Sequence, residues 1–108
     1  MKRRRHSRQR YEARAAIAKA LAHPTRLMIL DALNDTEMCV CDLTELAGAD
    51  QSTVSKHLAI LKQAGLVEDR KKGVMAFYRV KVCCLKEFWR CLETVLAQNL
   101  KAQQAALR

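Results

Sequence analysis

The sequence lacks a long apolar run. No stretch of its 108 residues approaches the roughly 20 apolar residues that a membrane-spanning helix needs. The N-terminus, MKRRRHSRQR, is basic but has no apolar stretch behind it, so it does not have the pattern of a secretory signal. We therefore expect a cytoplasmic protein without a membrane partner. The sequence also has no internal repeat and no sign of a second domain, as expected for a chain this short.

Catalytic groups are lacking as well, because no nucleophile–base pair stands out, and we expect no enzyme activity. The chain has an excess of positive charge instead. Its net charge is +9, and residues 1–14 carry seven basic residues against the single acidic Glu12. Such an excess favours polyanions: DNA, RNA or an anionic membrane. Residues 1–12 are interpreted as a basic tail, which is either solvated and disordered or adds phosphate and minor-groove contacts.

The five cysteines are an odd number, which argues against a purely structural disulfide framework. In the cytoplasm we expect them to be thiols. Clustered thiols serve packing, redox chemistry or the binding of soft metals, and the sequence leaves these three uses open. The cysteines are Cys39, Cys41, Cys83, Cys84 and Cys91.

Apolar periodicity predicts a mainly helical chain with one small β-hairpin. Pro24 fits the first position of a helix, where its missing N–H costs nothing. Gly48 is suited to a left-handed helix cap, and Gly73 to the hairpin turn. The predicted helices cover about 11–22, 25–33, 41–47, the segment from about 51 to 64 and the segment from 84 on, and the predicted strands cover 66–70 and 74–80.

The last predicted helix carries an apolar stripe over about four turns. A single small domain leaves little to cover that stripe. A second copy of the chain is the natural cover, the chain's own first helix is the alternative, and both arrangements can coexist. The stripe consists of Leu85, Phe88, Trp89, Leu92, Val95, Leu96 and Leu100.

A short helix, the turn GADQS and an amphipathic helix follow one another in the order typical of a helix-turn-helix. The second of these helices places small or cationic residues outside, which lets its backbone approach a DNA major groove. A basic hairpin tip follows at once and forms the wing. The alternative is a helical bundle with a solvated Lys/Ser face. His57 is open to three roles, as a DNA contact, a partly buried structural residue or, in principle, a metal ligand. The predicted DNA contacts are Gln51, Ser52, Thr53, Ser55, Lys56, His57, Lys62, Arg70, Lys71 and Lys72.

The segments ALAHPTRLMILDAL, CVCDL and QSTVSKHLAILKQAGLVEDRKKGVMAFYRV together resemble the ArsR/SmtB family of metal-responsive repressors, over about residues 15–80. CVCDL is similar to the arsenical-resistance repressors in particular. The resemblance implies a winged helix-turn-helix homodimer that sits on a palindromic DNA operator and leaves it when metal binds. The expected architecture is a basic tail over 1–12 and a winged helix-turn-helix domain over 13–106, with dimerisation helices at both of its ends.

In the arsenical repressors that the chain resembles, both cysteines of CVCDL are ligands, and a third cysteine often follows three residues later. Here that position is Thr44, so Cys39 and Cys41 leave a three-thiol site incomplete. Residues i and i+2 of a regular helix point roughly 200° apart. We therefore expect these two thiols to meet only if the start of their helix is unwound or strained, which would also let ligand binding distort the DNA-binding helices.

The third ligand is sought among Cys83, Cys84 and Cys91. Cys84 and Cys91 share a face of a regular helix but lie about 10.5 Å apart along it, so they meet only across a dimer. The last helix has no histidine, which argues against a zinc, cobalt or nickel sensor there. Thiol chemistry favours arsenite or antimonite, followed by cadmium, lead or bismuth.

Two other functions stay open. The first is a repressor of the same fold that responds to thiol oxidation or persulfides, which needs a thiolate with a depressed pKa. The second lies outside regulation: a basic RNA-binding or adaptor module, whose binding would survive substitution of Ser55 or Lys56.

Overall fold

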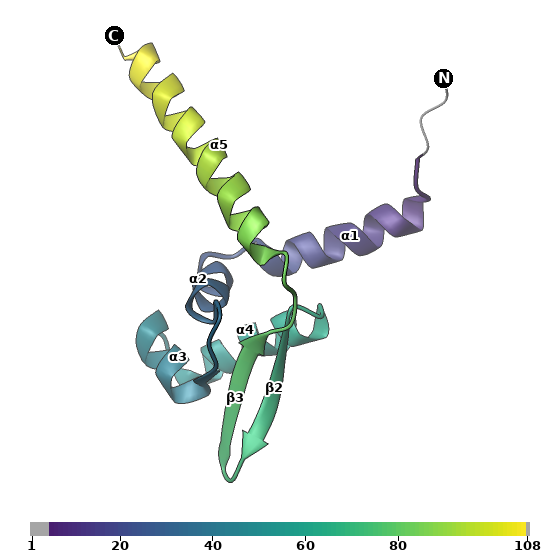
Figure 1. Cartoon of the computed structure of the whole chain (residues 1–108), viewed down its shortest axis with the longest axis vertical. Helices are drawn as coiled ribbons and strands as arrows, with labels where there is room; N and C mark the ends of the chain where they lie inside the picture. The colour runs from purple at the N-terminus through teal and green to yellow at the C-terminus, as the bar shows by residue number, and fades with distance from the viewer. Residues whose placement is uncertain (1–4, 108) are drawn as a thin grey trace.

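The computed structural model of the protein describes residues 5–107. Within them the chain forms five helices and three strands, and the predicted helices and hairpin are confirmed (Figure 1). Lys2, Arg3 and Arg4 of the predicted tail lie outside the described residues. The elements are α1 (Arg8–Leu21), α2 (Pro24–Ala32), β1 (Met38–Cys39), α3 (Val40–Ala47), α4 (Gln51–Gln63), β2 (Val67–Lys72), β3 (Met75–Val80) and α5 (Leu85–Ala106).

The first helix starts earlier than its apolar pattern predicts, at Arg8 instead of about Tyr11. Ser7 causes this early start, because its side chain accepts a hydrogen bond from the backbone N–H of Arg10. A serine in this position satisfies one of the free N–H groups at a helix start. Residues 8–12 of the predicted tail are therefore helical.

The predicted hairpin, β2 and β3, is extended by a third strand into an antiparallel sheet with the order β1-β3-β2. The added strand is only two residues long and pairs Met38 with Tyr78 and Cys39 with Phe77. At the hairpin turn Gly73 has a φ of +65°, a conformation that glycine adopts without strain. Short as it is, β1 joins the segment before α3 to the wing.

The core lies between α2, α3, α4 and the sheet. The predicted inward stripe of α4 is confirmed, because Val54, Leu58 and Leu61 are fully buried. Ile29 and Leu30 of α2 are buried against them. Burial of this size stabilises a fold by roughly 1.5–3 kcal/mol for each large side chain.

Helices α1 and α5 diverge from this core like two arms (Figure 1). The stripe of α5 is buried or half-buried as far as Leu92, but Val95, Leu96 and Leu100 are 46%, 53% and 58% exposed. The outer part of the stripe is therefore not covered by the chain's own first helix, which was the alternative to a second copy. None of the described helices is both long and apolar enough to cross a membrane.

Candidate nucleic-acid interface and thiol site

The helix-turn-helix is built by two caps. The Gly48 backbone ends α3 in the left-handed conformation, with its N–H donating to the carbonyls of Thr44 and Glu45. The Asp50 carboxylate then starts α4, accepting from the Thr53 N–H and the Ser52 hydroxyl at 2.8 Å each. These hydrogen bonds, with that from Thr53 the largest, lower the pKa of Asp50 to about 2. The turn thus fixes the angle at which α4 leaves α3.

The outer face of α4 carries most of the predicted DNA contacts. Thr53 is half-buried, and Lys62 pairs with Asp69 of β2 at 2.7 Å, a contact that raises the pKa of the Lys62 ammonium. The remaining members of the face are hydroxyl, amide and ammonium groups, which suit phosphate and base edges. The exposed predicted contacts on α4 are Gln51, Ser52, Ser55, Lys56 and Lys62.

The wing differs from its prediction at Arg70. Strand β2 continues to Lys72, so the tip of the hairpin is Gly73–Val74, and Arg70 lies within the strand. Its guanidinium donates to the Glu37 carboxylate at 2.6 to 3.0 Å and lies 5.5 Å from the centre of the Phe77 ring. This pairing lowers the pKa of Glu37. All three predicted wing cations thus lie in β2, and Lys71 and Lys72 are the two nearest the tip.

His57 is half-buried on the inner flank of α4. Its Nδ1 lies 3.2 Å from Nη1 of Arg26, and its ring centroid lies 4.4 Å from that of His23. Burial first, then His23 and Arg26, lower the pKa of His57. Of the three roles open to His57, these contacts are those of the partly buried structural residue.

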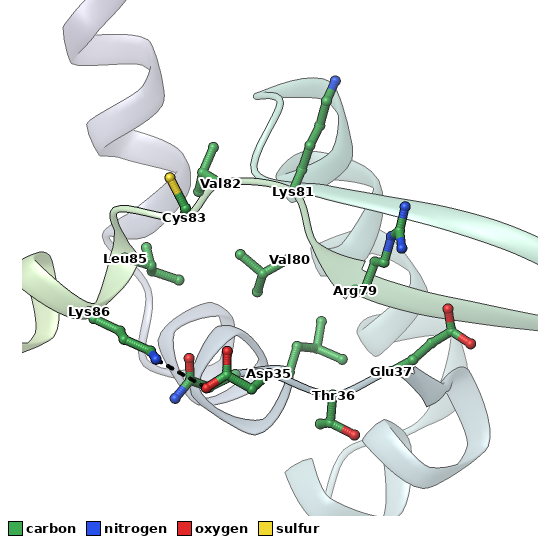
Figure 2. A pocket seen from close by; sticks show the side chains of 12 residues that line it. Asp35, Thr36, Glu37, Arg79, Val80, Lys81, Val82, Cys83, Leu85 and Lys86 are labelled. Carbon is green, nitrogen blue, oxygen red and sulfur yellow. Dashed lines mark ion pairs between the residues drawn. The ribbon is translucent and has the colours of Figure 1, made fainter.

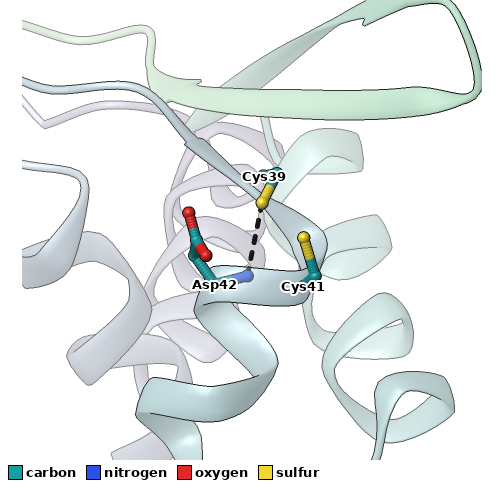
Figure 3. Close-up of side chains that lie close together, drawn as sticks. All are labelled: Cys39, Cys41 and Asp42. Carbon is teal, nitrogen blue, oxygen red and sulfur yellow. Dashed lines mark hydrogen bonds between the residues drawn. The ribbon is translucent and has the colours of Figure 1, made fainter.

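Cys39 and Cys41 lie together because Cys39 lies outside the helix, so the unwound helix start that their meeting requires is present. Cys39 is the N-cap of α3 and has an extended backbone, with φ −77° and ψ 161°, and only Cys41 belongs to the helix. The two Sγ atoms and a carboxylate oxygen of Asp42 all lie within 4.8 Å of one another (Figure 3). The 200° separation applies only when both residues are helical. The thiol pair is therefore formed by the helix start itself.

The two thiols have different surroundings. Cys39 is buried, and its Sγ accepts from the Asp42 N–H at 3.3 Å, whereas Cys41 is exposed. Hydrogen bonding with Cys41 is the largest of the influences that raise the pKa of Cys39. The pair opens on a cleft of about 270 Å³, which is bordered by Gln51 at the start of α4 and by Val74 at the tip of the wing. The thiol site thus touches both elements of the predicted DNA interface.

Asp42 is the donor that the sequence interpretation missed. Among the described residues, Cys39, Cys41 and Asp42 form the one cluster with the dimensions of a metal site. The signal was present in the sequence, because a carboxylate three residues after an N-cap regularly reaches back towards the cap. Thr44 occupies the position of the third cysteine, and its hydroxyl donates to the Val40 carbonyl at 2.8 Å.

The other three cysteines gather near the start of α5 but make no such cluster. Cys84 occupies the N-cap of α5 without a capping hydrogen bond, and Cys83, Cys84 and Cys91 are all exposed. Cys83 borders a cleft of about 660 Å³, on whose wall Lys86 pairs with Asp35 at 3.2 Å (Figure 2). Within one chain they are therefore not brought to the site of Cys39 and Cys41.

Comparison with known proteins matches residues 23–69 to the arsR family of bacterial regulatory proteins. The chain is 42% identical over 86 residues to an uncharacterized HTH-type transcriptional regulator of Methanocaldococcus jannaschii, which covers 79% of this chain and 97% of that protein. It is 35% identical over 99 residues to the arsenical resistance operon repressor of Escherichia coli, covering 82% and 85% of the two chains. A homodimeric winged helix-turn-helix DNA-binding domain from Mycobacterium bovis superposes with a TM-score of 0.74 at 30% identity, covering 90% of this chain and 93% of that one.

Proposed function

Because the chain belongs to the ArsR family of transcriptional regulators, we propose that this repressor leaves its operator DNA when arsenite or antimonite binds Cys39 and Cys41. The observation that carries the proposal is the convergence of two thiols and a carboxylate at the start of α3. This helix is the first of the helix-turn-helix pair. A ligand held there acts directly on the DNA-binding unit. The family consists of regulators and not of enzymes.

The DNA-bound form is proposed to be a homodimer on a palindromic operator. The uncovered outer stripe of α5 supports a second copy as its cover, and the M. bovis neighbour is homodimeric. In each copy the outer face of α4 reads the major groove, and Lys71 and Lys72 contact the neighbouring backbone. Lys62 and Arg70 would have to exchange Asp69 and Glu37 for phosphate. His57 is not proposed as a DNA contact.

The ligand chemistry follows from the donor set. Trihydroxyarsenic and two thiols form two As–S bonds and release two waters, which leaves one hydroxyl on arsenic. Sulfurs on one zinc-sized ion lie at most about 4.6 Å apart, because each bond is about 2.3 Å long. The two Sγ atoms lie within 4.8 Å of each other, so little movement brings them within this limit. On cadmium, which brings no such hydroxyl, Asp42 would supply an oxygen as the third donor beside the two sulfurs.

Coupling to DNA follows from what surrounds Cys39. Its Sγ caps α3, and its backbone pairs with Phe77 of the wing strand β3. A ligand that takes up this sulfur competes with the cap and shifts the segment between wing and helix-turn-helix. Ligand and DNA then favour different shapes, which is negative coupling. Couplings of this kind typically change an affinity by about 5–150-fold.

The test is a titration of the reduced, metal-free protein on its own upstream DNA, followed by fluorescence anisotropy, with arsenite and then cadmium, zinc and peroxide. We expect arsenite to raise the operator Kd by about 5–150-fold in the unaltered protein. The Cys39→Ser/Cys41→Ser variant should stay bound, because serine keeps the cap but not the thiolates. The matched control, Cys83→Ser/Cys84→Ser/Cys91→Ser, should still respond.

Each alternative has its own outcome in this titration. If the Cys39→Ser/Cys41→Ser variant is released and the triple variant is not, sensing lies at the base of α5. If only peroxide releases DNA, the protein is a redox-responsive repressor. If Lys56→Ala leaves nucleic-acid binding unchanged, the basic module without operator specificity is the better description.

A further inference from the structure

Arg26 joins three helices through one guanidinium. It lies on α2, its Nε donates to the carbonyl of Ala20 at 2.7 Å, and its Nη2 donates to that of Lys19 at 3.3 Å. Both carbonyls belong to the last turn of α1, where helix carbonyls need partners from outside the regular pattern; that of Lys19 also accepts from the Ala22 N–H at 3.2 Å. The third contact, from Nη1 at 3.2 Å, is to Nδ1 of His57 on α4. One side chain thus ties the end of an arm to the helix proposed to read DNA.

The Arg26 contact defines the protonation state of His57. Arginine has donors only and stays charged, so Nδ1 of His57 must be the acceptor and carry no proton. Protonated histidine has two donors and no acceptor. Adding a proton to His57 therefore removes this hydrogen bond and places a second cation 3.2 Å from the guanidinium. Burial and the neighbouring His23 and Arg26 hold the pKa of His57 below its ordinary value.

His23 extends the same cluster. It caps α2, its Nδ1 accepts from the Thr25 N–H at 3.1 Å, and its ring lies against that of His57. From α2 and its cap, His57 is therefore faced by Arg26 and His23. The backbone carbonyls of Lys19 and Ala20 on α1 bind the same guanidinium of Arg26 that contacts His57. On α4 its neighbour Lys56 is exposed.

The position of the cluster gives it a role. Helix α1, one of the two helices predicted to form the dimer, has two exposed apolar side chains, Tyr11 and Ile17. Helix α4 presents the DNA-reading face. In a dimeric helix-turn-helix protein, the placement of the reading helices relative to the dimer sets the distance between half-sites. A contact between α1 and α4 therefore controls operator fit without touching DNA.

We propose that Arg26 is a positioning residue that holds α4 against the end of α1 through a neutral His57, so that protonation of His57 weakens operator binding. The inference rests on the proposed function only in taking α4 as the helix that reads DNA. It is independent of the thiols. The opposite sign is expected if His57 faces DNA, because a new cation beside phosphates strengthens binding.

The experiment measures operator Kd by anisotropy from pH 7.5 to 5.0 at constant ionic strength, with reduced, metal-free protein. All variants carry His6→Gln, which removes the histidine of the N-terminal segment from the titration. We expect the Kd of the parent to rise at least about fivefold as the pH falls, within the range of known couplings. His57→Gln should bind like the parent at pH 7.5 and keep a flat profile, because its amide oxygen accepts from Arg26 at every pH.

The variant Arg26→Lys provides a second test of the same inference. Lysine keeps the charge but not the planar fork, so it cannot serve three acceptors in this geometry. Its Kd should exceed that of the parent at pH 7.5, and its pH profile should be shallower. Sedimentation and circular dichroism check dimer and fold, and if Arg26→Lys does not fold, the His57→Gln profile decides alone.

Several results would overturn the inference: tighter binding by the parent at low pH, a flat parental profile, or a Kd of His57→Gln that rises at low pH as much as that of the parent. An operator Kd of Arg26→Lys equal to that of the parent at pH 7.5 would also overturn the inference. The absence of specific DNA binding at every pH would instead contradict the proposed function. A parallel His23→Gln variant assigns any residual slope, since its ring is the other imidazole of the cluster.

Discussion

The body of the molecule, formed by α2, α3, α4 and the sheet, and its arms, α1 and α5, bury their apolar residues to different degrees. In the body Leu43 and Leu58 are entirely buried within one chain. On the outer half of α5, Leu96 and Leu100 stay more than half exposed although they continue a regular stripe. A single copy therefore completes the body but leaves the outer half of α5 uncovered, which is where the proposed second copy would contribute.

The cysteines of the body and those of the arm α5 also differ in whether they lie close together. Cys39 and Cys41 of the body are held together by the start of a helix packed into the core. Cys83, Cys84 and Cys91, at the base of an arm, are exposed and make no cluster within the chain. The number of thiols is therefore a poor guide to a metal site. The local backbone at each thiol decides whether two of them share a ligand.

The largest expected effect tests the body. Leu58→Ala removes a fully buried side chain of α4 and should lower the free energy of unfolding by about 2–5 kcal/mol, at every protein concentration. The matched control is Val74→Ala at the exposed wing tip, which should change it by about 0.5 kcal/mol or less. Urea denaturation measures both. Equal losses of unfolding free energy in the two variants would contradict the distinction between the buried core and the exposed wing tip.

The second prediction tests the arm. Leu96→Asp should raise the dimer dissociation constant at least about tenfold, because each buried leucine is worth roughly 1.5–3 kcal/mol and aspartate resists burial. Gln98→Asp adds the same charge to the opposite face of α5 and should leave the dimer intact. Sedimentation velocity at several concentrations measures this. If both variants dissociate equally, the dimer does not use the α5 stripe.

Much of the body was predictable from sequence because its signals are local. Pro24, Gly48 and the Val54–Leu61 stripe each specify a backbone or a face without help from distant residues. The two-residue strand β1 was not predictable, since a strand that short has no periodicity and exists only through pairing with β3. The early start of α1 depended on the Ser7 cap, in a segment with no apolar period.

The candidate site was predictable in composition but not in geometry. The two predicted thiols do lie close together, yet their angle depended on whether Cys39 was helical or capping, a difference of one residue in a helix boundary. Asp42 was missed because its place in the first turn of α3 depends on where that helix starts. Arg26 was not singled out, since its three acceptors come from two other helices.

The third prediction concerns the donor that distinguishes this thiol pair. Asp42→Asn should weaken cadmium binding at least about tenfold, the lower end of what loss of an outer ligand-sphere partner costs, and should affect arsenite less. Thr44→Cys, which adds a third sulfur one turn after Cys41, should strengthen arsenite binding. Competition with a chromophoric chelator measures the first effect, and the operator titration measures the second. Equal cadmium affinity in Asp42→Asn and the parent would remove Asp42 from the site.

The smallest effect compares the caps of a body helix and an arm helix. Asp50 starts α4 with a carboxylate whose pKa is about 2, below its ordinary 3.8, whereas Ser7 starts α1 with a hydroxyl that does not titrate. The stability that ionised Asp50 contributes is present above its unfolded pKa and is lost as the pH falls through the folded value. Asp50→Ser keeps an acceptor without a titrating group. The free energy of unfolding should therefore fall more steeply from pH 4 to 2 in the parent than in Asp50→Ser. Urea denaturation at each pH measures it. Parallel pH profiles for the two proteins would show that the Asp50 charge does not stabilise the turn.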